Sequence, residues 1–260
     1  ATKKPRRVCP AGLFFVQSTR SLALQYGVNE LRQLGLGGPS PDVFHPTPID
    51  LPTVPLNGPA YYSRARSVAT GMDFMCAVIT GRNEYNEDRP FATGAVYCVG
   101  NNRFRSTAYP QFSAGSATPL VVTSWLRQVS EPGRDGATVF VASSSGSKDA
   151  CAVIYTGDVW CWGANGYGQM GMNTVNAVPP NNTDGSVPGA VLPLAGVVCQ
   201  ENTGVPTYNT GTPCPRGVAV GGFHMMAITT SKALYVWGSN WWGQLGLGDV
   251  VDRWIPTIGF

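Results

Sequence analysis

The stretch DVWCWGANGYGQMG at residues 158–171 decides the fold, because the chain contains further copies of it. Its glycines at 166, 168 and 171 have the Gly-x-Gly-x-x-Gly spacing of a dinucleotide-binding loop, which requires a helix directly after the third glycine. The residues that follow, MNTVNAVPPNNTDGS, contain paired prolines and weak helix formers without a helical apolar period. The stretch therefore predicts a turn within a repeat, and no cofactor.

The repeat returns three more times along the chain. The copies are ALYVWGSNWWGQLGLGD at 233–249, LALQYGVNELRQLGLGG at 22–38 and a degraded GAVYCVGNN at 94–102. Their aligned glycines at 27, 100, 163 and 238 recur at intervals of 73, 63 and 75 residues. These intervals exceed the usual period of a one-unit propeller repeat, so we expect insertions in every unit.

Each unit contains four short strand-like segments, with small residues in the first and, in every unit but the second, an aromatic–glycine pair in the third. Small residues suit the innermost strand of a propeller blade, because blades crowd together near the axis. The sequence therefore predicts an all-β fold, a β-propeller of four four-stranded blades in a single domain over 1–260. The predicted blades are approximately 6–56, 64–125, 138–196 and 216–260.

Composition agrees with a turn-rich β protein, since 32 glycines and 21 prolines accompany only 13% charged residues. The net charge of +3 comes from four basic residues among the first seven, which leaves 14 basic against 15 acidic side chains elsewhere. A near-neutral body has no electrostatic footprint for nucleic acid, so we expect no such partner. No apolar run is long enough for a membrane span.

The pattern VAVGGFH followed by ALYVWGSNWWGQLGLGD resembles the repeat of the regulator of chromosome condensation family. Propellers of that family commonly have seven blades, so the resemblance implies that the four units could be part of a larger ring. A four-bladed ring is also within the range at which propellers close. We predict closure within one chain, with the first inner strand at 6–12 against the inner strand at 216–222.

The cysteines recur at equivalent positions of the second and third units, where the fourth unit has Met226 and Val236. Two positions that are both cysteine or both apolar behave as neighbours across a hairpin. A further pair would close the insertion between the third and fourth units, while Cys9 could be free, buried or bonded to another chain. The predicted disulfides are Cys76–Cys98, Cys151–Cys161 and Cys199–Cys214.

Disulfides indicate an extracytoplasmic compartment: secreted, cell-surface, periplasmic or the lumen of an organelle. The sequon at Asn181 is a possible glycosylation site and agrees with secretion. The chain has no Cys-x-x-Cys and only two histidines, His45 and His224, so no metal site is expected. Neither a Gly-x-Ser-x-Gly elbow nor a histidine-centred constellation occurs, and no catalytic residue is expected.

Trp241 and Trp242, with Tyr167 at the homologous place one blade earlier, are the candidate interaction residues. They could form an exposed aromatic ledge or pack between blades. We expect a non-enzymatic propeller that binds a protein or glycan, or serves as a structural subunit of a larger assembly. The family resemblance implies, as an alternative, nucleotide exchange on a small GTPase, and a hydrolase with an axial pocket is a third hypothesis.

Overall fold

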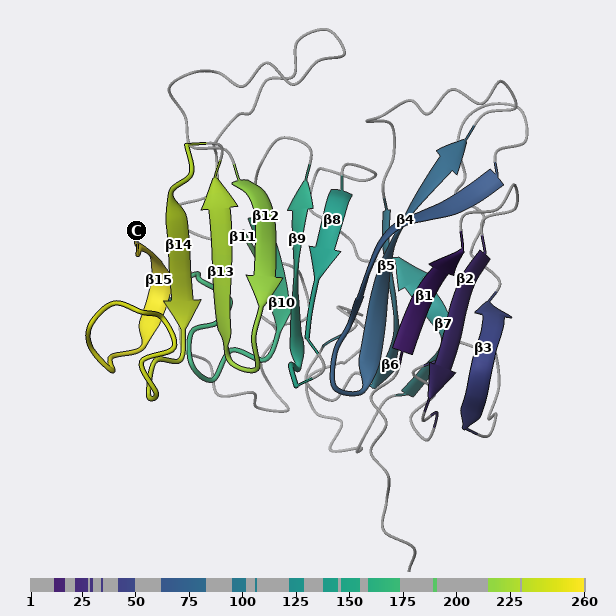
Figure 1. The fold of residues 1–260 in the computed structure, drawn as a ribbon, viewed down its shortest axis with the longest axis horizontal. Coiled ribbons are helices and arrows are strands. Elements are labelled where there is room, and N and C mark those ends of the chain that lie inside the picture. The colour runs from purple at the N-terminus through teal and green to yellow at the C-terminus, as the bar shows by residue number, and fades with distance from the viewer. Residues whose placement is uncertain are drawn as a thin grey trace, which may run out of the picture.

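Every regular element that the structure describes is a β-strand, and the strands form four antiparallel sheets (Figure 1). The structure is a computed structural model. It describes residues 12–16, 22–27, 29, 34, 42–49, 62–82, 95–101, 106, 122–128, 138–144, 146–154, 159–173, 189–190, 215–229 and 231–259.

The sheets follow one another along the chain, and each contains strands that are consecutive in sequence. The first sheet has three strands, β1 (Gly12–Val16), β2 (Leu22–Gly27) and β3 (Val43–Ile49). The second has β4 (Tyr62–Thr70), β5 (Phe74–Arg82), β6 (Ala95–Asn101) and β7 (Val122–Gln128). The third has β8 (Thr138–Ala142), β9 (Asp149–Ile154), β10 (Val159–Gly163) and β11 (Gly189–Ala190). The fourth has β12 (Pro215–Val220), β13 (His224–Thr229), β14 (Leu234–Gly238) and β15 (Arg253–Ile258).

The last three sheets have the four strands that the sequence predicts, in the predicted order. Two outer strands differ in extent: β7 runs to Gln128 rather than ending at 125, and β11 contains only Gly189 and Ala190. The predicted innermost strand of the first unit, at 6–12, lies almost wholly outside the described residues.

A glycine closes the third strand wherever the next loop must cross close over the second strand. Gly163 has a φ of 105°, and a Cβ on it would lie 2.5 Å from the backbone oxygen of Lys148. Gly238 has a φ of 97° and meets the backbone oxygen of Phe223 at the same distance. Only glycine fits such a site without strain, which explains why the aromatic–glycine pair recurs in the sequence.

Neighbouring sheets pack face to face through apolar side chains. We call the side of each sheet that carries the cysteine positions its forward face and the opposite side its rear face. One core joins the forward face of the second sheet (Ala69, Phe74, Cys76, Val78, Val96, Cys98) to the rear face of the third (Val141, Ala150, Ala152, Trp162). The next core joins the forward face of the third sheet (Ala142, Cys151, Val153, Val159, Cys161) to the rear face of the fourth (Val218, Val220, Met225, Ala227, Tyr235, Trp237).

A tryptophan seals each of these two interfaces with a hydrogen bond to the preceding blade. The indole Nε1 of Trp162 donates to the backbone oxygen of Ser106 at 3.0 Å, and that of Trp237 donates to the backbone oxygen of Gln169 at 2.8 Å. Both tryptophans are fully buried. Ser106 and Gln169 occupy equivalent positions in their repeats, so the aromatic residue of the third strand is the seal between blades.

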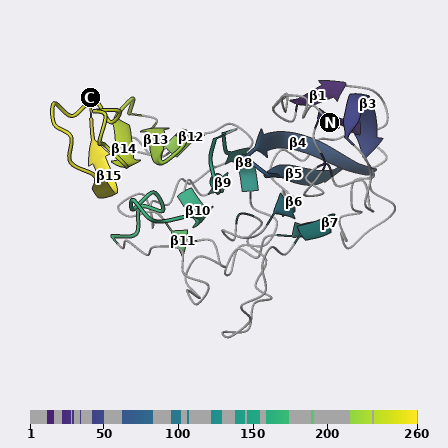
Figure 2. The ribbon, with the colours of Figure 1, turned by 90° about the horizontal axis from the view of Figure 1, so that it is seen from below.

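The first and last sheets lie at opposite ends of the molecule, with β1–β3 at one end and β12–β15 at the other (Figures 1 and 2). The prediction that the first unit contacts the last within one chain is therefore wrong. The turn from each sheet to the next is too small for four sheets to close a ring (Figure 2). Large side chains such as Trp162 and Trp237 fill the interfaces, and a close-packed interface holds neighbouring sheets at a fixed separation.

Candidate functional site

The glycine-rich loop after each third strand is held by a buried asparagine. In the fourth blade the Oδ1 of Asn240 accepts a hydrogen bond from the backbone N–H of Leu245 at 2.9 Å, and its Nδ2 donates to the backbone oxygen of Asp249 at 2.9 Å. The same lock joins Asn165 to the N–H of Met170 in the third blade at 3.0 Å. The first blade repeats it between Asn29 and Leu34, also at 3.0 Å.

A glutamine in the same loop fixes the residue two places before it. The Oε1 of Gln169 accepts from the backbone N–H of Tyr167 at 2.8 Å, and the Oε1 of Gln244 accepts from Trp242 at 2.8 Å. Consecutive turns complete the loop, with Gly168 N–H donating to the backbone oxygen of Asn165 at 3.2 Å. The Gly-x-Gly-x-x-Gly spacing thus builds a rigid turn that presents an aromatic side chain, as its repetition predicts.

The aromatic side chains gather where the third and fourth blades meet. The ring of Tyr167 lies edge-to-face against Phe223, with centroids 5.2 Å apart, and against Trp241 at 5.6 Å. Trp241 is 64% exposed, Trp242 is 91% exposed and Phe223 is 44% exposed. We call Tyr167, Phe223, Trp241 and Trp242 the aromatic surface. Soluble proteins rarely expose large apolar side chains as a group without a binding role.

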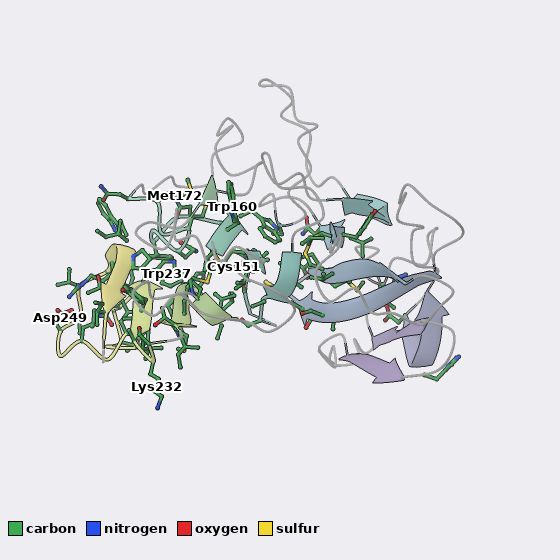
Figure 3. All side chains as sticks on the ribbon, turned by 90° about the horizontal axis from the view of Figure 1, so that it is seen from above. Cys151, Trp160, Met172, Lys232, Trp237 and Asp249 are labelled. Carbon is green, nitrogen blue, oxygen red and sulfur yellow. A yellow bond between two sulfur atoms is a disulfide. The ribbon has the colours of Figure 1, made fainter. Side chains whose placement is uncertain are left out.

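A charged pair lies next to this surface in the same loop. A guanidinium nitrogen of Arg253 lies 2.5 Å from Oδ2 of Asp249, and Oδ1 of Asp249 accepts from the N–H of Val251 at 2.9 Å. The hydrogen bond from Arg253 and the one from Val251 lower the pKa of Asp249. Aromatic side chains beside a polar rim are the usual anatomy of a protein-binding site. Figure 3 shows Asp249 at the outer end of the fourth sheet.

The structure brings two of the predicted interaction residues, Tyr167 and Trp241, into ring contact, and Trp242 follows Trp241 in the chain. Tyr167 packs between the blades, whereas Trp242 projects into solvent. Phe223 is a member that sequence reasoning missed. Its signal was its place in the turn GGFH, directly before the second strand of the fourth unit.

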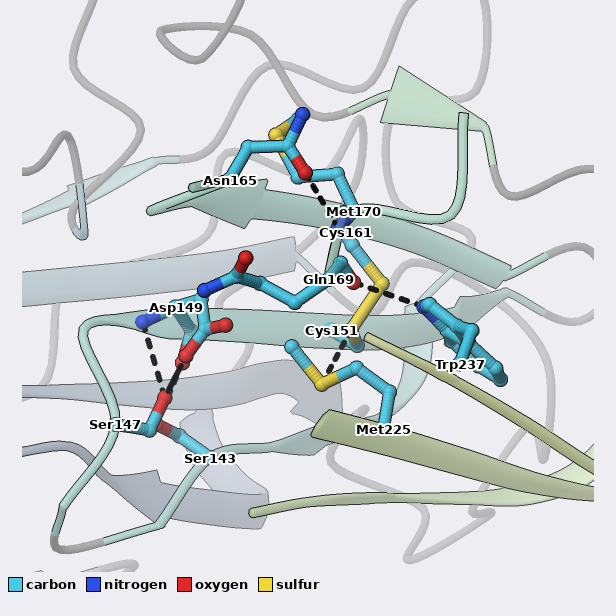
Figure 4. Close-up of a disulfide and its surroundings, with 10 residues drawn as sticks. All are labelled: Ser143, Ser147, Asp149, Cys151, Cys161, Asn165, Gln169, Met170, Met225 and Trp237. Carbon is cyan, nitrogen blue, oxygen red and sulfur yellow. Dashed lines mark hydrogen bonds between the residues drawn. A yellow bond between two sulfur atoms is a disulfide. The ribbon is translucent and has the colours of Figure 1, made fainter. Parts of the chain in front are cut away.

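Two disulfides cross the middle strands of the second and third sheets. Cys76 pairs with Cys98 and Cys151 pairs with Cys161, each pair directly opposite in the antiparallel register with Cα atoms 4.1 Å apart. The sulfur of Cys151 also lies 3.8 Å from the sulfur of Met225 on the rear face of the fourth blade (Figure 4). The remaining predictions, on Cys199, Cys214, Cys9 and Asn181, lie outside the described residues.

Replacing both Cys151 and Cys161 with valine lowers the free energy of unfolding by about 3 kcal/mol, because the cross-link no longer restricts the unfolded chain. Valine keeps the site apolar, as the fourth blade does with its buried Val236. The measurement is urea denaturation of the variant and of the oxidised parent. Reducing the parent also breaks Cys76–Cys98 and should therefore lower its stability further than the double substitution does. A variant as stable as the oxidised parent would contradict the prediction.

A buried carboxyl group lies close to the second disulfide. Asp149 occupies the position of His224 in the fourth repeat and Phe74 in the second, and it is fully buried (Figure 4). Its Oδ1 accepts a hydrogen bond from the hydroxyl of Ser147. Its Oδ2 has no hydrogen-bond partner within the part of the chain that the structure describes. Burial raises the pKa of Asp149 to about 7.

His224 takes this position in the fourth blade as a half-buried side chain folded over Gly221, where an added Cβ would meet its ring. Burial lowers the pKa of His224. Within the described ranges, no three histidine, cysteine, aspartate or glutamate residues are grouped so that they could hold a metal ion. Nor does any helix there have the length and apolar character needed to cross a bilayer.

Four antiparallel sheets packed in series, with the third and the fourth each sealed to the one before by a tryptophan, define a β-propeller repeat protein. Two models of the Regulator of chromosome condensation (RCC1) repeat match the chain, over residues 216–240 and 233–258. These matches, together with the fold, support the RCC1-repeat β-propeller family, as the sequence resemblance implies.

Known relatives share the repeats over part of their length. The chain is 32% identical over 120 residues to the probable E3 ubiquitin-protein ligase HERC4 of Rattus norvegicus, covering 45% of this chain and 9% of that protein. It is 31% identical over 111 residues to the ultraviolet-B receptor UVR8 of Arabidopsis thaliana, covering 43% and 20%. The chain thus spans a fifth or less of these two relatives.

A solved structure shares the fold over nearly the whole of this chain. Prp20p from Saccharomyces cerevisiae, described with its binding properties to Gsp1p and histones, superimposes with a TM-score of 0.60 at 17% identity. The match covers 96% of this chain and 48% of Prp20p. The all-β propeller fold is therefore confirmed.

Proposed function

We propose that this chain is a non-enzymatic, protein-binding propeller of an extracytoplasmic compartment, and that the aromatic surface contacts its partner. The observation that carries the proposal is the exposure of two consecutive tryptophans, Trp241 and Trp242, with the ring of Trp241 against Tyr167 and that of Tyr167 against Phe223. Tryptophan and tyrosine are enriched among the residues that contribute most to protein binding.

Preorganisation supports this role for the loop. The backbone around Trp242 is held by the side chains of Asn240 and Gln244, so little chain entropy is lost when a partner binds. Trp242 itself does not contribute to the core, since nearly all of its surface is exposed. Its exposure therefore needs an explanation other than stability, and a binding partner supplies one.

Three considerations support the remaining parts of the proposal. The solved neighbour Prp20p binds proteins, as its description states. The two disulfides cross-link the middle of two blades, and such bonds persist in oxidising compartments. Half of the buried polar residues in the described part of the chain take part in loop locks and blade seals, which are structural roles: Asn29, Ser106, Asn165, Gln169 and Asn240.

Replacing Trp241 and Trp242 together with alanine should weaken partner binding at least about tenfold while leaving the fold intact, because exposed side chains add little to stability. Folded domains and peptides displayed on phage would be selected on the immobilised chain, and the affinity of each selected binder would be measured for both forms. Met72→Ala is the matched control, since Met72 is an exposed apolar residue in a turn of another blade.

Binders that bind the double variant as tightly as the parent would contradict the aromatic surface as the contact. If a glycan array gave ligands while the selection gave no protein or peptide binder, the partner would be a glycan and not a protein. The compartment has a separate test: mass spectrometry of the native protein after alkylation in intact cells. Free thiols at Cys76, Cys98, Cys151 and Cys161 would overturn the extracytoplasmic part alone.

A further inference from the structure

The two carboxyl oxygens of Asp149 have different surroundings. The side chain lies at the start of β9, close to the glycine-rich loop of the third blade, and is fully buried (Figure 4). Its Oδ1 lies beside the hydroxyl of Ser147, whereas its Oδ2 is buried without a hydrogen-bond partner among the described residues. A buried negative charge without a donor is costly, so these surroundings favour the neutral acid.

The turn before Asp149 can serve this acid in both protonation states. The Ser147 hydroxyl accepts from the backbone N–H of Asp149 at 3.0 Å and lies 2.6 Å from its backbone oxygen as well as beside Oδ1. A hydroxyl has one hydrogen. With an ionised carboxylate that hydrogen goes to Oδ1, and the hydroxyl of Ser143, at 2.9 Å, still serves the backbone oxygen. With a protonated acid the carboxyl O–H donates to Ser147, whose hydrogen then goes to the backbone oxygen. The change of charge therefore falls on Oδ2.

Gln169 links this acid to the aromatic surface. Figure 4 shows the side-chain amide of Gln169 next to the carboxyl group of Asp149. Burial raises the pKa of Asp149 to about 7, and the Gln169 side chain is among the groups that act in the opposite direction. The Oε1 of the same amide accepts from the backbone N–H of Tyr167 at 2.8 Å, and the backbone oxygen of Gln169 accepts from the indole of Trp237.

No other charge acts on this acid among the described residues. The strands packed against β9, which are β8, β10 and β12, contribute no described ionisable side chain besides the disulfide-bonded Cys161. The ionisable groups in the turns and loops around Asp149 are Lys148, Asp73, Tyr167 and His224. After burial, the pKa of Asp149 is shifted by hydrogen bonds from Ser147, Gln169 and backbone N–H groups, and no ion pair contributes.

We propose that the protonation of Asp149 regulates the aromatic surface through Gln169, an inference that rests on the proposed function of that surface. While the acid is neutral, Gln169 keeps its Oε1 on the N–H of Tyr167, whose ring packs against Phe223 and Trp241. An ionised carboxylate attracts the Nε2 of Gln169 to Oδ2, because this buried oxygen has no other donor in the described part of the chain. The amide turns to make that bond, and Oε1 leaves Tyr167. The surface is thus ordered while Asp149 is protonated and loosened when it ionises.

The fourth blade contains the same loop without the acid. The Oε1 of Gln244 accepts from the N–H of Trp242 at 2.8 Å, and its Nε2 donates to the hydroxyl of Ser239 at 3.3 Å. The position of Asp149 is taken by His224, and burial lowers the pKa of His224, so that it is neutral at about pH 7 and above. The N–H of Trp242 should therefore keep its hydrogen bond through the neutral range.

Amide hydrogen exchange of the 260-residue chain tests the inference without a partner. Between about pH 6 and about pH 8 the protection factor of the Tyr167 amide, which corrects for the intrinsic pH dependence of exchange, should fall at least about tenfold, while that of Trp242 changes less than about twofold. Asp149→Asn keeps a neutral polar side chain and should hold Tyr167 at the low-pH value of the parent throughout. Gln169→Met removes the amide and should leave Tyr167 weakly protected at both pH values. His224→Gln is the matched control and should retain the pH dependence of the parent.

The outcomes separate this inference from the proposed function. A Tyr167 protection factor that is equal at the two pH values, that falls equally in Asp149→Asn, or that falls no more than that of Trp242 would overturn the inference. If Asp149→Asn does not fold, as judged by far-ultraviolet circular dichroism, the parent and Gln169→Met decide the same point.

Phage-selected binders give the second measurement. Their affinity for the parent should fall at least about threefold from the lower to the higher pH and should not change with Asp149→Asn. Binders that depend on Trp241 and Trp242 but bind equally at both pH values would overturn the inference. Binders that do not depend on these two tryptophans would contradict the proposed function alone, because the exchange of Tyr167 is measured without them.

Discussion

Trp237→Ala is expected to lower the free energy of unfolding by about 3–5 kcal/mol, the usual cost of removing a large aromatic side chain from a core. Trp237 is fully buried in the core between the third and fourth sheets, and its Nε1 donates to the backbone oxygen of Gln169. The substitution leaves a cavity and a buried oxygen without its donor. Urea denaturation followed by far-ultraviolet circular dichroism measures the loss.

The location of the loss distinguishes a blade seal from an ordinary core residue. Because repeat proteins gain stability from nearest-neighbour interfaces, amides of β13 and β14 should lose protection against hydrogen exchange, while those of β5 and β6 keep theirs. Trp237→Phe fills most of the space without the N–H and should cost about 1–3 kcal/mol. Equal loss of protection in the second and fourth sheets would show that the seal is not local.

The repeat made most of the fold predictable. Four copies of one stretch located the third strand of each unit, and the strands before it followed from short apolar segments bounded by glycine. Register within a hairpin was also accessible, because equivalent cysteines in two units and an apolar pair in a third indicate side chains that face each other. These inferences need only contacts that are local along the chain.

Closure was not predictable in the same way. Whether four blades form a ring depends on the angle between neighbouring sheets, which is set by side chains such as Trp162 that come from a different blade than the surface they cover. The role of Phe223 was missed for a related reason. Its partner Tyr167 is far away in sequence and belongs to the preceding blade.

Asp149 was also absent from the sequence analysis, although its signal was present. It stands where the fourth repeat has the half-buried His224 and the second has the buried Phe74. A carboxyl group at this position of the repeat indicates a buried ionisable group. The structure answers with a fully buried carboxyl group that receives a hydrogen bond from Ser147. Such a group makes stability depend on pH.

The parent should lose up to about 4 kcal/mol of unfolding free energy as the pH rises from about 4 to 7, by an order-of-magnitude linkage argument from the shifted pKa. Burial raises the pKa of Asp149 from its usual value of 3.8 to about 7 in the folded protein. In this window the folded protein binds a proton that the unfolded chain has released, so stability falls with pH. Above pH 7 both states are ionised and the loss is complete.

Asp149→Asn removes the ionisable group and should remove this pH-dependent part of the stability. The difference in unfolding free energy between parent and variant should therefore change between about pH 4 and 7 and stay constant at higher pH. Urea denaturation at a series of pH values gives the difference. Asp249→Asn is the matched control: a hydrogen bond from Arg253 lowers the pKa of Asp249, so its contribution is lost only as the pH falls below about 4, and the free-energy difference between parent and this variant should stay constant from pH 4 to 7. A parent and an Asp149→Asn variant with parallel profiles from pH 4 to 7 would show that Asp149 is ionised in the folded protein.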